Sequence, residues 1–255
     1  MGAFLLYFWR LLLYMQLIID VGNTRVKAAI YKGDALQAKH HFALQDFSEE
    51  VGEFAGLYPI KKAIVSSVGR LTDEQARSVQ LRFPTIVLSH NTTLPFTNDY
   101  GTPETLGVDR MALVAAFMQA HPQKNGLIID AGTCITYDFI TDKGSYKGGA
   151  ISPGLRLRYE TLNRLTANLP LLEKQMPDSI IGSSTEESIH SGVVQGTLLE
   201  IDGAINHYKE HYNVDTVIIT GGDGEFLAKR LKNSIFAHSN FLLEGLNYIL
   251  TYQND

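Results

Sequence analysis

The chain has 255 residues, of which 45% are hydrophobic and 19% are charged, and its formal net charge is −5. This length fits one large domain or two domains of about 100–130 residues each. No basic block or stripe of lysine and arginine occurs, which argues against nucleic acid as a partner. The single cysteine, Cys134, excludes an internal disulfide and favours a reducing, cytoplasmic location.

The first segment, residues 2–15, is apolar apart from Arg10. A membrane-spanning helix needs about 20 apolar residues, and a secretory signal needs a basic start and a small-residue cleavage site, which this segment lacks. We therefore expect residues 1–14 to be an extension that results from a start codon assigned too early, with Met15 as the true first residue. A membrane anchor is the alternative, but we expect no stable membrane association.

The next hundred residues alternate between strand and helix patterns. Apolar runs and apolar–polar alternation predict strands, whereas apolar residues at helical spacing predict helices. The predicted order is βββαβαβα, with strands at 17–20, 25–31 and 36–43, a helix at 46–58, a strand at 62–68, a helix at 72–83, a strand at 85–88, and a helix from Pro103, capped by Thr102, to about residue 120.

The second half repeats this order after a hinge that we expect at residues 121–125. Its predicted elements are strands at 127–130, 133–140 and 146–151, helices at 155–166 and 186–212, a strand at 214–220, a helix at 226–231, a strand at 234–237 and a helix at 241–252. We therefore predict an α/β protein with two halves, 15–122 and 123–255.

One phrase occurs in both halves. Residues 17–24 read LIIDVGNT, and residues 127–134 read LIIDAGTC. An apolar run followed by Asp-x-Gly predicts a buried strand that ends in a tight turn. Such a turn offers backbone N–H groups and short hydroxyls to a phosphate, while its carboxylate can hold a cation. Two copies predict an enzyme that grips one nucleotide from both sides.

Further motifs accompany these turns. In chain order they are the turn from Asp20 to Lys27, the segment from Tyr100 to Arg110, the turn from Asp130 to Asp138, the glycine-rich segment from Gly148 to Gly154, the segment from Thr185 to Gly192, and Thr220-Gly221-Gly222. In this order they closely resemble the motifs of type III pantothenate kinases, a family of the acetate and sugar kinase, Hsp70 and actin superfamily. The resemblance implies two ribonuclease H-like halves of the actin-like ATPase type, with a cleft between them.

The turns supply the expected ATP and phosphate ligands. Gly22 allows close approach of the backbone, and Lys27 could reach the phosphates as a point charge. An ordinary hairpin and a solvated strand lysine are the alternatives. The residues assigned to ATP and phosphate are Asp20, Val21, Gly22, Asn23, Thr24, Arg25, Val26 and Lys27 in the first turn, Gly132 and Thr133 in the second, and Gly221 and Gly222 near the adenosine.

Two carboxylates are candidates for holding cations. We expect Asp20 to orient a hydrated Mg²⁺, because that ion keeps several of its waters. By resemblance, Asp130 helps to bind a monovalent cation, K⁺ or NH₄⁺. An oxygen-ligand site agrees with either ion, and residue chemistry alone does not distinguish them.

Asp109 is the candidate catalytic residue. It lies in a mainly apolar helical stretch, where a carboxylate is costly to bury unless it is paired or used. A salt bridge or a charge on the helix surface is the alternative. The resemblance makes Asp109 the base that accepts the hydroxyl proton of pantothenate, although its main contribution could be orientation.

The same resemblance assigns the substrate pocket. Arg110 could bind the pantothenate carboxylate through two hydrogen bonds, and a structural ion pair is its alternative. Thr185 could contact substrate or cap a helix. The residues assigned to pantothenate are Tyr100, Gly107, Val108, Asp109, Arg110 and Thr185.

The sequence thus predicts ATP-dependent phosphorylation of pantothenate to 4′-phosphopantothenate, the first step of coenzyme A biosynthesis. The resemblance implies a homodimer whose acyl pocket lies at the subunit interface, so the Gly148–Gly154 segment could let a partner surface approach. The alternatives are another small-molecule kinase of the same superfamily, and a non-catalytic, nucleotide-gated regulatory protein.

Overall fold

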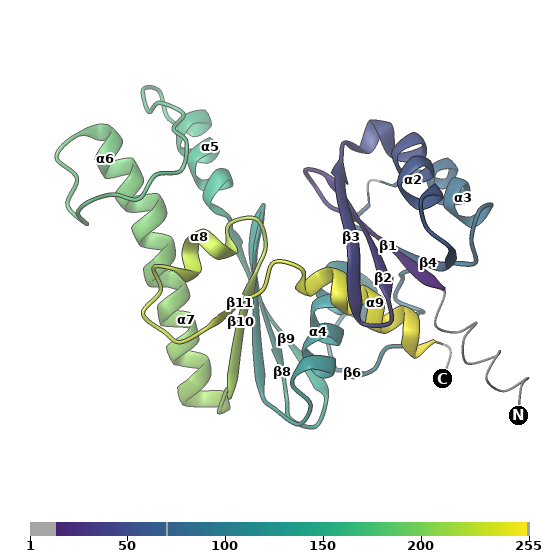
Figure 1. The fold of residues 1–255 in the computed structure, drawn as a ribbon. Helices are drawn as coiled ribbons and strands as arrows, with labels where there is room; N and C mark the ends of the chain where they lie inside the picture. Colours follow the sequence, from purple (N-terminus) through teal and green to yellow (C-terminus); the bar gives the residue numbers. More distant parts are fainter. Residues whose placement is uncertain (1–13, 70, 254–255) are drawn as a thin grey trace, which may run out of the picture. The chain divides into compact units, whose positions relative to one another are not determined.

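The computed structural model describes residues 14–69 and 71–253, so the predicted N-terminal extension lies outside the described residues except for Tyr14. The chain forms two compact units, each built around one sheet (Figure 1). Of the described residues, unit 1 contains those up to Phe96, Gly101–Ala120 and those from Phe241 onward, and unit 2 contains Thr97–Tyr100 and His121–Asn240. Within the described ranges, no helix is both long and apolar enough to cross a bilayer.

Unit 1 holds a five-stranded sheet in the order β3-β2-β1-β4-β5. Strands β1, β2 and β3 pair antiparallel, whereas β4 lies parallel to β1 and β5 parallel to β4. Side chains alternate between the two faces along each strand, so Ile18 and Asp20 point away from the face of Leu17 and Ile19. The strands are β1 (Met15–Val21), β2 (Val26–Lys32), β3 (Ala35–Phe42), β4 (Ile60–Ser67) and β5 (Thr85–Val87).

Helices cover both faces of this sheet. After the short turn η1 (Leu44–Asp46), α2 (Phe47–Gly56) and α3 (Asp73–Gln80) close one apolar core with the inward side chains of β1, β2 and β4. On the other face, α4 (Val108–Ala120) and α9 (Phe241–Tyr252) pack on each other and on β4. The two helices cross closely, because a Cβ on Gly245 would lie 1.8 Å from the Ala112 carbonyl oxygen.

Unit 2 holds a six-stranded sheet in the order β11-β10-β7-β8-β9-β6. Its strands are β6 (Thr97–Asn98), β7 (Gly126–Ala131), β8 (Cys134–Ile140), β9 (Ser145–Pro153), β10 (Thr216–Thr220) and β11 (Phe236–Ala237). Without β6, the order β9-β8-β7-β10-β11 repeats the order of unit 1, with the same parallel and antiparallel pairings. The predicted α/β fold with duplicated ribonuclease H-like halves is confirmed.

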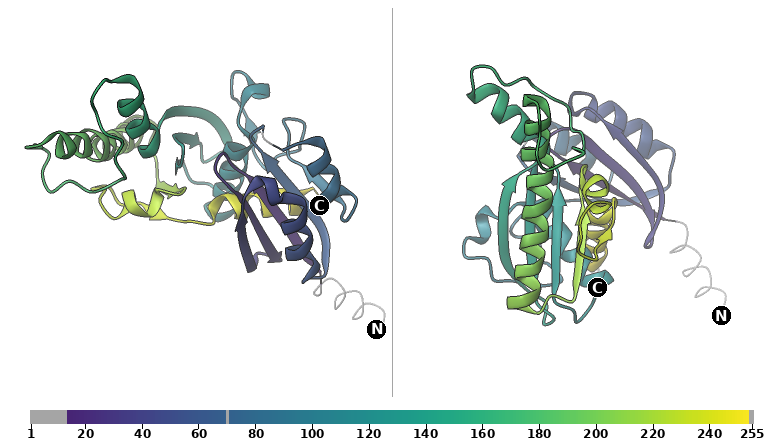
Figure 2. Two further views of the ribbon diagram at one scale, coloured as in Figure 1. Left: turned by 90° about the horizontal axis from the view of Figure 1, so that it is seen from above. Right: turned by 90° about the vertical axis from the view of Figure 1, so that its left-hand side faces the viewer.

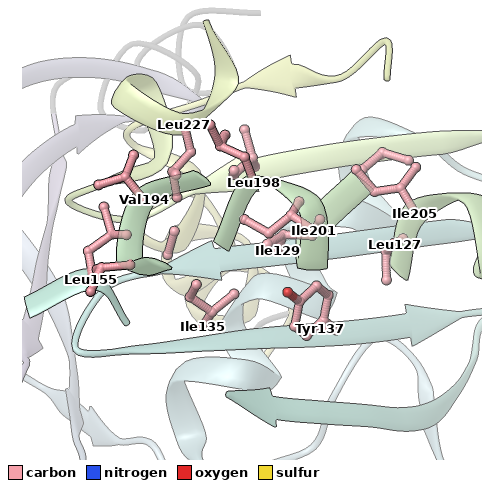
Figure 3. Packing of buried hydrophobic residues seen from close by; sticks show 14 of the residues in the cluster. Leu127, Ile129, Ile135, Tyr137, Leu155, Val194, Leu198, Ile201, Ile205 and Leu227 are labelled. Atoms are coloured by element: carbon pink, nitrogen blue, oxygen red, sulfur yellow. The ribbon is translucent and has the colours of Figure 1, made fainter. Parts of the chain in front are cut away.

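The core of unit 2 forms between its sheet and its helices. Figure 3 shows Leu127 and Ile129 of β7 packed with Leu198, Ile201 and Ile205 of α7, and α7 lies along the strands in the right-hand view of Figure 2. The helical elements of this unit are α5 (Leu155–Leu165), α6 (Thr185–His190), the π-helical turn η3 (Ser191–Gln195), α7 (Gly196–Tyr212) and α8 (Gly224–Ala228).

Two helices differ from the sequence prediction. The helix expected from Pro103 to residue 120 is interrupted, because η2 (Pro103–Thr105) ends before α4 begins at Val108. The extended backbone of Leu106 separates them, and this break makes Asp109 part of a helix N-terminus. The final helix, expected within the 123–255 half, packs on α4 in unit 1. The division into halves at 122/123 remains a prediction about the repeated order of elements.

Candidate active site

The first acidic turn joins β1 to β2. Asp20 and Val21 end β1, Val26 and Lys27 begin β2, and a backbone hydrogen bond from the Gly22 N–H to the Arg25 carbonyl oxygen (3.2 Å) closes the turn. The two valines are buried, which anchors the turn in the sheet. The predicted phosphate ligands at its tip are all exposed, namely Asn23, Thr24 and Arg25.

Asp20 lies on the sheet face that carries α4 and α9. The residue is only 5% exposed, and its register partners are Lys27 on β2 and Ser66 on β4. The Lys27 Nζ lies 3.9 Å from the Asp20 Oδ2. Lys27 therefore faces the carboxylate of its own turn and is not simply a solvated strand lysine.

Burial raises the pKa of Asp20 to about 6. The positive charge of Lys27 lowers it, the negative charge of Asp109 raises it again, and Ser66 lowers it. Asp109 lies in the first turn of α4, which packs on the sheet face that carries Asp20, so the predicted base and the first acidic turn belong to the same unit. A carboxylate with a raised pKa beside a second carboxylate is an arrangement typical of functional sites.

Asp109 is held at the N-terminus of α4. Its Oδ1 accepts a hydrogen bond from the Arg110 backbone N–H at 2.8 Å, and a helix N-terminus favours negative charge. A Cβ on Gly107 would lie 2.4 Å from the same Oδ1. Gly107 therefore leaves the space that the carboxylate occupies. Val108 and the Arg110 side chain are both buried.

The second acidic turn lies at the corresponding place in unit 2, between β7 and β8, but it is shorter than the first. Asp130 is half-buried near the end of β7, and its register partners are Thr136 on β8 and Thr220 on β10. The Gly132 N–H donates to the Cys134 carbonyl oxygen (2.9 Å). Thr133 lies exposed at the tip. In both copies of the repeated phrase, an aspartate thus lies near the end of a central strand and is paired with a hydroxyl residue on the neighbouring parallel strand.

Gly221 is fitted against this second turn. Its φ is +90°, and a Cβ would lie 2.4 Å from both the Ala131 carbonyl oxygen and the Asp130 Oδ1. The Asp223 N–H also donates to the Ala131 carbonyl oxygen (2.9 Å). Only glycine fits such a position. Gly222, by contrast, has open space around it, so the structure itself does not require a glycine there.

The remaining substrate candidates lie in unit 2. The Tyr100 ring stacks with the Tyr146 ring and covers Gly148, which has a φ of +96°. Thr185 is exposed in the first turn of α6. The alternative that Thr185 caps this helix is wrong, because the N-cap is Ser184, whose hydroxyl accepts from the Glu187 N–H.

The glycine-rich segment serves close contacts within its own subunit. A Cβ on Gly149 would lie 1.6 Å from the Tyr137 carbonyl oxygen, and one on Gly154 would lie 2.1 Å from the Gly132 carbonyl oxygen. Gly154 also donates its N–H to the Thr133 carbonyl oxygen (3.0 Å). These contacts within one subunit are sufficient to account for glycine at both positions, without a partner subunit. Those of Gly154 also hold the second acidic turn in place.

Comparison with known proteins identifies the family. A family model described as type III pantothenate kinase matches residues 16–207. A type III pantothenate kinase of Flavobacterium johnsoniae is 48% identical over 242 residues, which cover 94% of this chain and 99% of that protein. The chain belongs to the type III pantothenate kinase family. This type III pantothenate kinase family member carries the predicted Asp-x-Gly turns on central strands of both sheets.

Solved structures share the fold of this family member at low sequence identity. A Baf family protein from Campylobacter jejuni has a TM-score of 0.65 and 22% identity, covering 93% of this chain and 98% of its own. A ROK family glucokinase from Streptomyces griseus has a TM-score of 0.52 and 9% identity, covering 91% and 98%. Both likenesses concern the duplicated fold alone.

The residues of the first turn fit a hydrated Mg²⁺. No group of three or more His, Cys, Asp or Glu side chains that could hold a metal occurs within residues 14–69 and 71–253. The described side chains therefore do not form a site in which the protein supplies every ligand of a metal ion. Mg²⁺ usually binds through one or two carboxylates, phosphates and its own waters, and the buried Asp20 carboxylate beside the covered Ser66 hydroxyl suits that mode.

Sequence reasoning missed two hydroxyls of this family member. Ser66 and Thr220 occupy corresponding places next to Asp20 and Asp130, on the strands that follow in each sheet. A signal was available in the sequence. Strands β4 and β10 occupy the same position in the repeated order of elements, and each has a hydroxyl residue near its C-terminal end. The register that places them beside the carboxylates came only from the structure.

Proposed function

We propose that the chain transfers the γ-phosphoryl group of ATP to the primary hydroxyl of pantothenate, giving 4′-phosphopantothenate for coenzyme A biosynthesis. Membership of the type III pantothenate kinase family supports the reaction. The observation that carries the assignment of residues is that α4, with Asp109 in its first turn, packs on the sheet face that carries Asp20. It joins the proposed acceptor base to the proposed phosphate turn.

Asp109 orients the pantothenate hydroxyl and accepts its proton. The hydrogen bond from the Arg110 N–H fixes one carboxylate oxygen, so the other can face the acceptor. Phosphoryl transfer depends mainly on positioning and charge stabilisation, with late proton transfer in a loose transition state. The Arg110 guanidinium binds the pantothenate carboxylate, and Tyr100, Gly107, Val108 and Thr185 are the other residues that we assign to pantothenate.

Both acidic turns bind the nucleotide. Asn23, Thr24 and Lys27 bind phosphates from the first turn, and Asp20 orients the waters of Mg²⁺. The ion, when bound, neutralises charge that develops on the phosphate oxygens. Gly132 and Thr133 bind from the second turn, while the loop at Gly221 and Gly222 lies against the adenosine.

We propose further that a monovalent cation binds at Asp130. The half-buried carboxylate lies beside hydroxyl residues on both neighbouring strands, and hard monovalent cations prefer oxygen ligands. Kinase rates with K⁺, NH₄⁺ or Na⁺ as the added cation should differ, and Asp130→Asn should remove the difference. Equal rates with all three cations in the unmodified enzyme would contradict this site.

We also propose a homodimer, in agreement with the family resemblance. The α5–α6 region carries exposed apolar side chains, which favour association, at Leu165, Leu171, Ile180 and Ile181. Light scattering after size-exclusion chromatography should give twice the mass of the chain. A mass of one chain at micromolar concentration would refute the dimer.

The decisive experiment is a coupled assay of ADP formation with and without pantothenate. Turnover should require pantothenate, and Asp109→Asn should lower kcat by about 10²–10⁴-fold while ATP still binds. Asp73→Asn is the matched control, because Asp73 also lies in the first turn of a helix but is exposed on α3. Pantothenate-independent turnover, or full kcat in Asp109→Asn, would overturn the proposal.

A further inference from the structure

The duplication places a hydroxyl beside each acidic residue. Asp20 stands in register with Ser66 on the parallel strand β4, and Asp130 stands in register with Thr220 on the parallel strand β10. Side chains in register on neighbouring strands point to the same face of a sheet. Each carboxylate therefore has a hydroxyl next to it, although the lengths of the two turns and the residues on their other side differ.

Ser66 lies on an otherwise apolar stretch of β4, with the Asp20 carboxylate in register on β1. Its side chain is 0% exposed, in a strand that otherwise buries Ala63, Ile64 and Val65. The Oγ is covered and makes no hydrogen bond of normal geometry to the described residues, yet it lies near enough to Asp20 to lower the pKa of that carboxyl. Burying a hydroxyl carries a desolvation cost, and the neighbour that the Ser66 hydroxyl affects is the Asp20 carboxyl.

We propose that Ser66 is a positioning residue of the magnesium–nucleotide site, with Thr220 as its counterpart at the monovalent-cation site. When the magnesium–nucleotide complex is bound, the Ser66 hydroxyl donates to one Asp20 oxygen and so fixes the other toward the water shell of the ion. Thr220 holds the Asp130 carboxylate in the same way. This inference rests on the proposed function.

Alanine at position 66 would fill almost the same space. It would remove the burial cost of the hydroxyl but also the effect of that hydroxyl on Asp20, so Ser66→Ala should change the melting temperature of the unliganded protein little. Groups that orient the ligands of a metal typically change metal affinity by about 10–100-fold when they are removed. Stability and magnesium-dependent binding should therefore respond in different ways to the same substitution.

The test is calorimetric binding of the non-hydrolysable analogue AMPPNP to the full chain, with and without Mg²⁺. Ser66→Ala should weaken binding by about 10–100-fold with Mg²⁺ and leave magnesium-free binding unchanged. Ser66→Thr, which keeps the hydroxyl, should restore at least part of the loss. The matched control is Ser67→Ala, which removes the neighbouring hydroxyl on the opposite face, where it accepts a hydrogen bond from the Leu71 N–H.

A second pair of variants keeps the inference testable if Ser66→Ala fails to fold. Thr220→Val has nearly the same shape and should lose most of the difference in kinase rate between K⁺ and Na⁺, whereas Thr220→Ser should keep it. Equal weakening of Ser66→Ala with and without Mg²⁺, or unchanged binding in both, would overturn the proposal. Pantothenate-independent ATP turnover would instead refute the proposed function, without affecting the binding result.

Discussion

Replacing Asp20 by asparagine should stabilise the unliganded protein at neutral pH while it damages the site. The carboxyl has a pKa of about 6 in the folded protein, against a reference value of 3.8, chiefly because it is buried. The difference is 6 − 3.8 = 2.2 pKa units, and one unit corresponds to about 1.36 kcal/mol. The charged carboxylate therefore lowers the free energy of unfolding by about 3 kcal/mol at pH 7.5.

The stability gained by Asp20→Asn should increase with pH. Between pH 3.8 and 6 the folded state keeps the Asp20 proton more firmly than the unfolded state does. The contribution of this group to stability therefore falls as pH rises through that window, and the full cost applies above it. The gain from Asp20→Asn should be about 3 kcal/mol at pH 7.5, about half of that at pH 5, and close to zero below pH 4.

Thermal and urea unfolding without nucleotide, in the presence of EDTA, would measure the gain at pH 7.5 and pH 5. Asp138→Asn is the matched control, because Asp138 is also a buried strand aspartate but accepts hydrogen bonds from the hydroxyls of Tyr146 (2.7 Å) and Thr136 (3.1 Å). Asparagine has one acceptor oxygen in place of two, so this variant should lose about 1–3 kcal/mol. An Asp20→Asn protein that is no more stable than the unmodified one at pH 7.5 would refute the reasoning.

Three further predictions concern the same two units. In the kinase assay, kcat/KM should fall as pH drops below about 6, since Asp20 then binds a proton in the free enzyme; a flat profile from pH 5 to 8 would contradict this. Gly221→Ala should lower the melting temperature, because a left-handed residue costs about 1–2 kcal/mol before the backbone clash is added, whereas Gly222→Ala should leave it unchanged. Gly245→Ala should destabilise unit 1 by at least about 1–3 kcal/mol, measured by urea unfolding, because it forces α9 away from the Ala112 carbonyl oxygen.

Local sequence patterns were sufficient for most of the strands and helices. The apolar runs that end at Asp20 and Asp130 predicted central strands, and both are central strands of their sheets. The break between η2 and α4 was missed, because Pro103 after Thr102 is a strong helix-start signal and the apolar spacing continues beyond it. Leu106 is buried, and its carbonyl oxygen is hydrogen-bonded to the His90 ring (2.9 Å), a long-range contact that local patterns do not reveal.

Long-range packing was not predictable from such patterns. The final helix follows the second half in sequence, yet it packs on α4 through a contact between Gly245 and Ala112. A glycine inside a helix normally weakens it, and nothing in the neighbouring sequence reveals which helix needs the space. The two-residue strand β6 was missed for the same reason, since it exists only through its pairing with β9.

The candidate site contains one residue that local sequence patterns predict and one that depends on long-range pairing of strands. Asp-x-Gly is a local signal, so Asp20 and its turn were predicted, whereas the neighbouring Ser66 depends on the register of a strand about forty-five residues away. Both residues oppose stability, one as a buried charge and the other as a covered hydroxyl that makes no normal hydrogen bond to the described residues. Rules that maximise stability would place apolar side chains at both positions. Their presence side by side is best explained by a ligand that binds at Asp20 while Ser66 orients the carboxylate, because functional sites are where a chain departs from its most stable sequence.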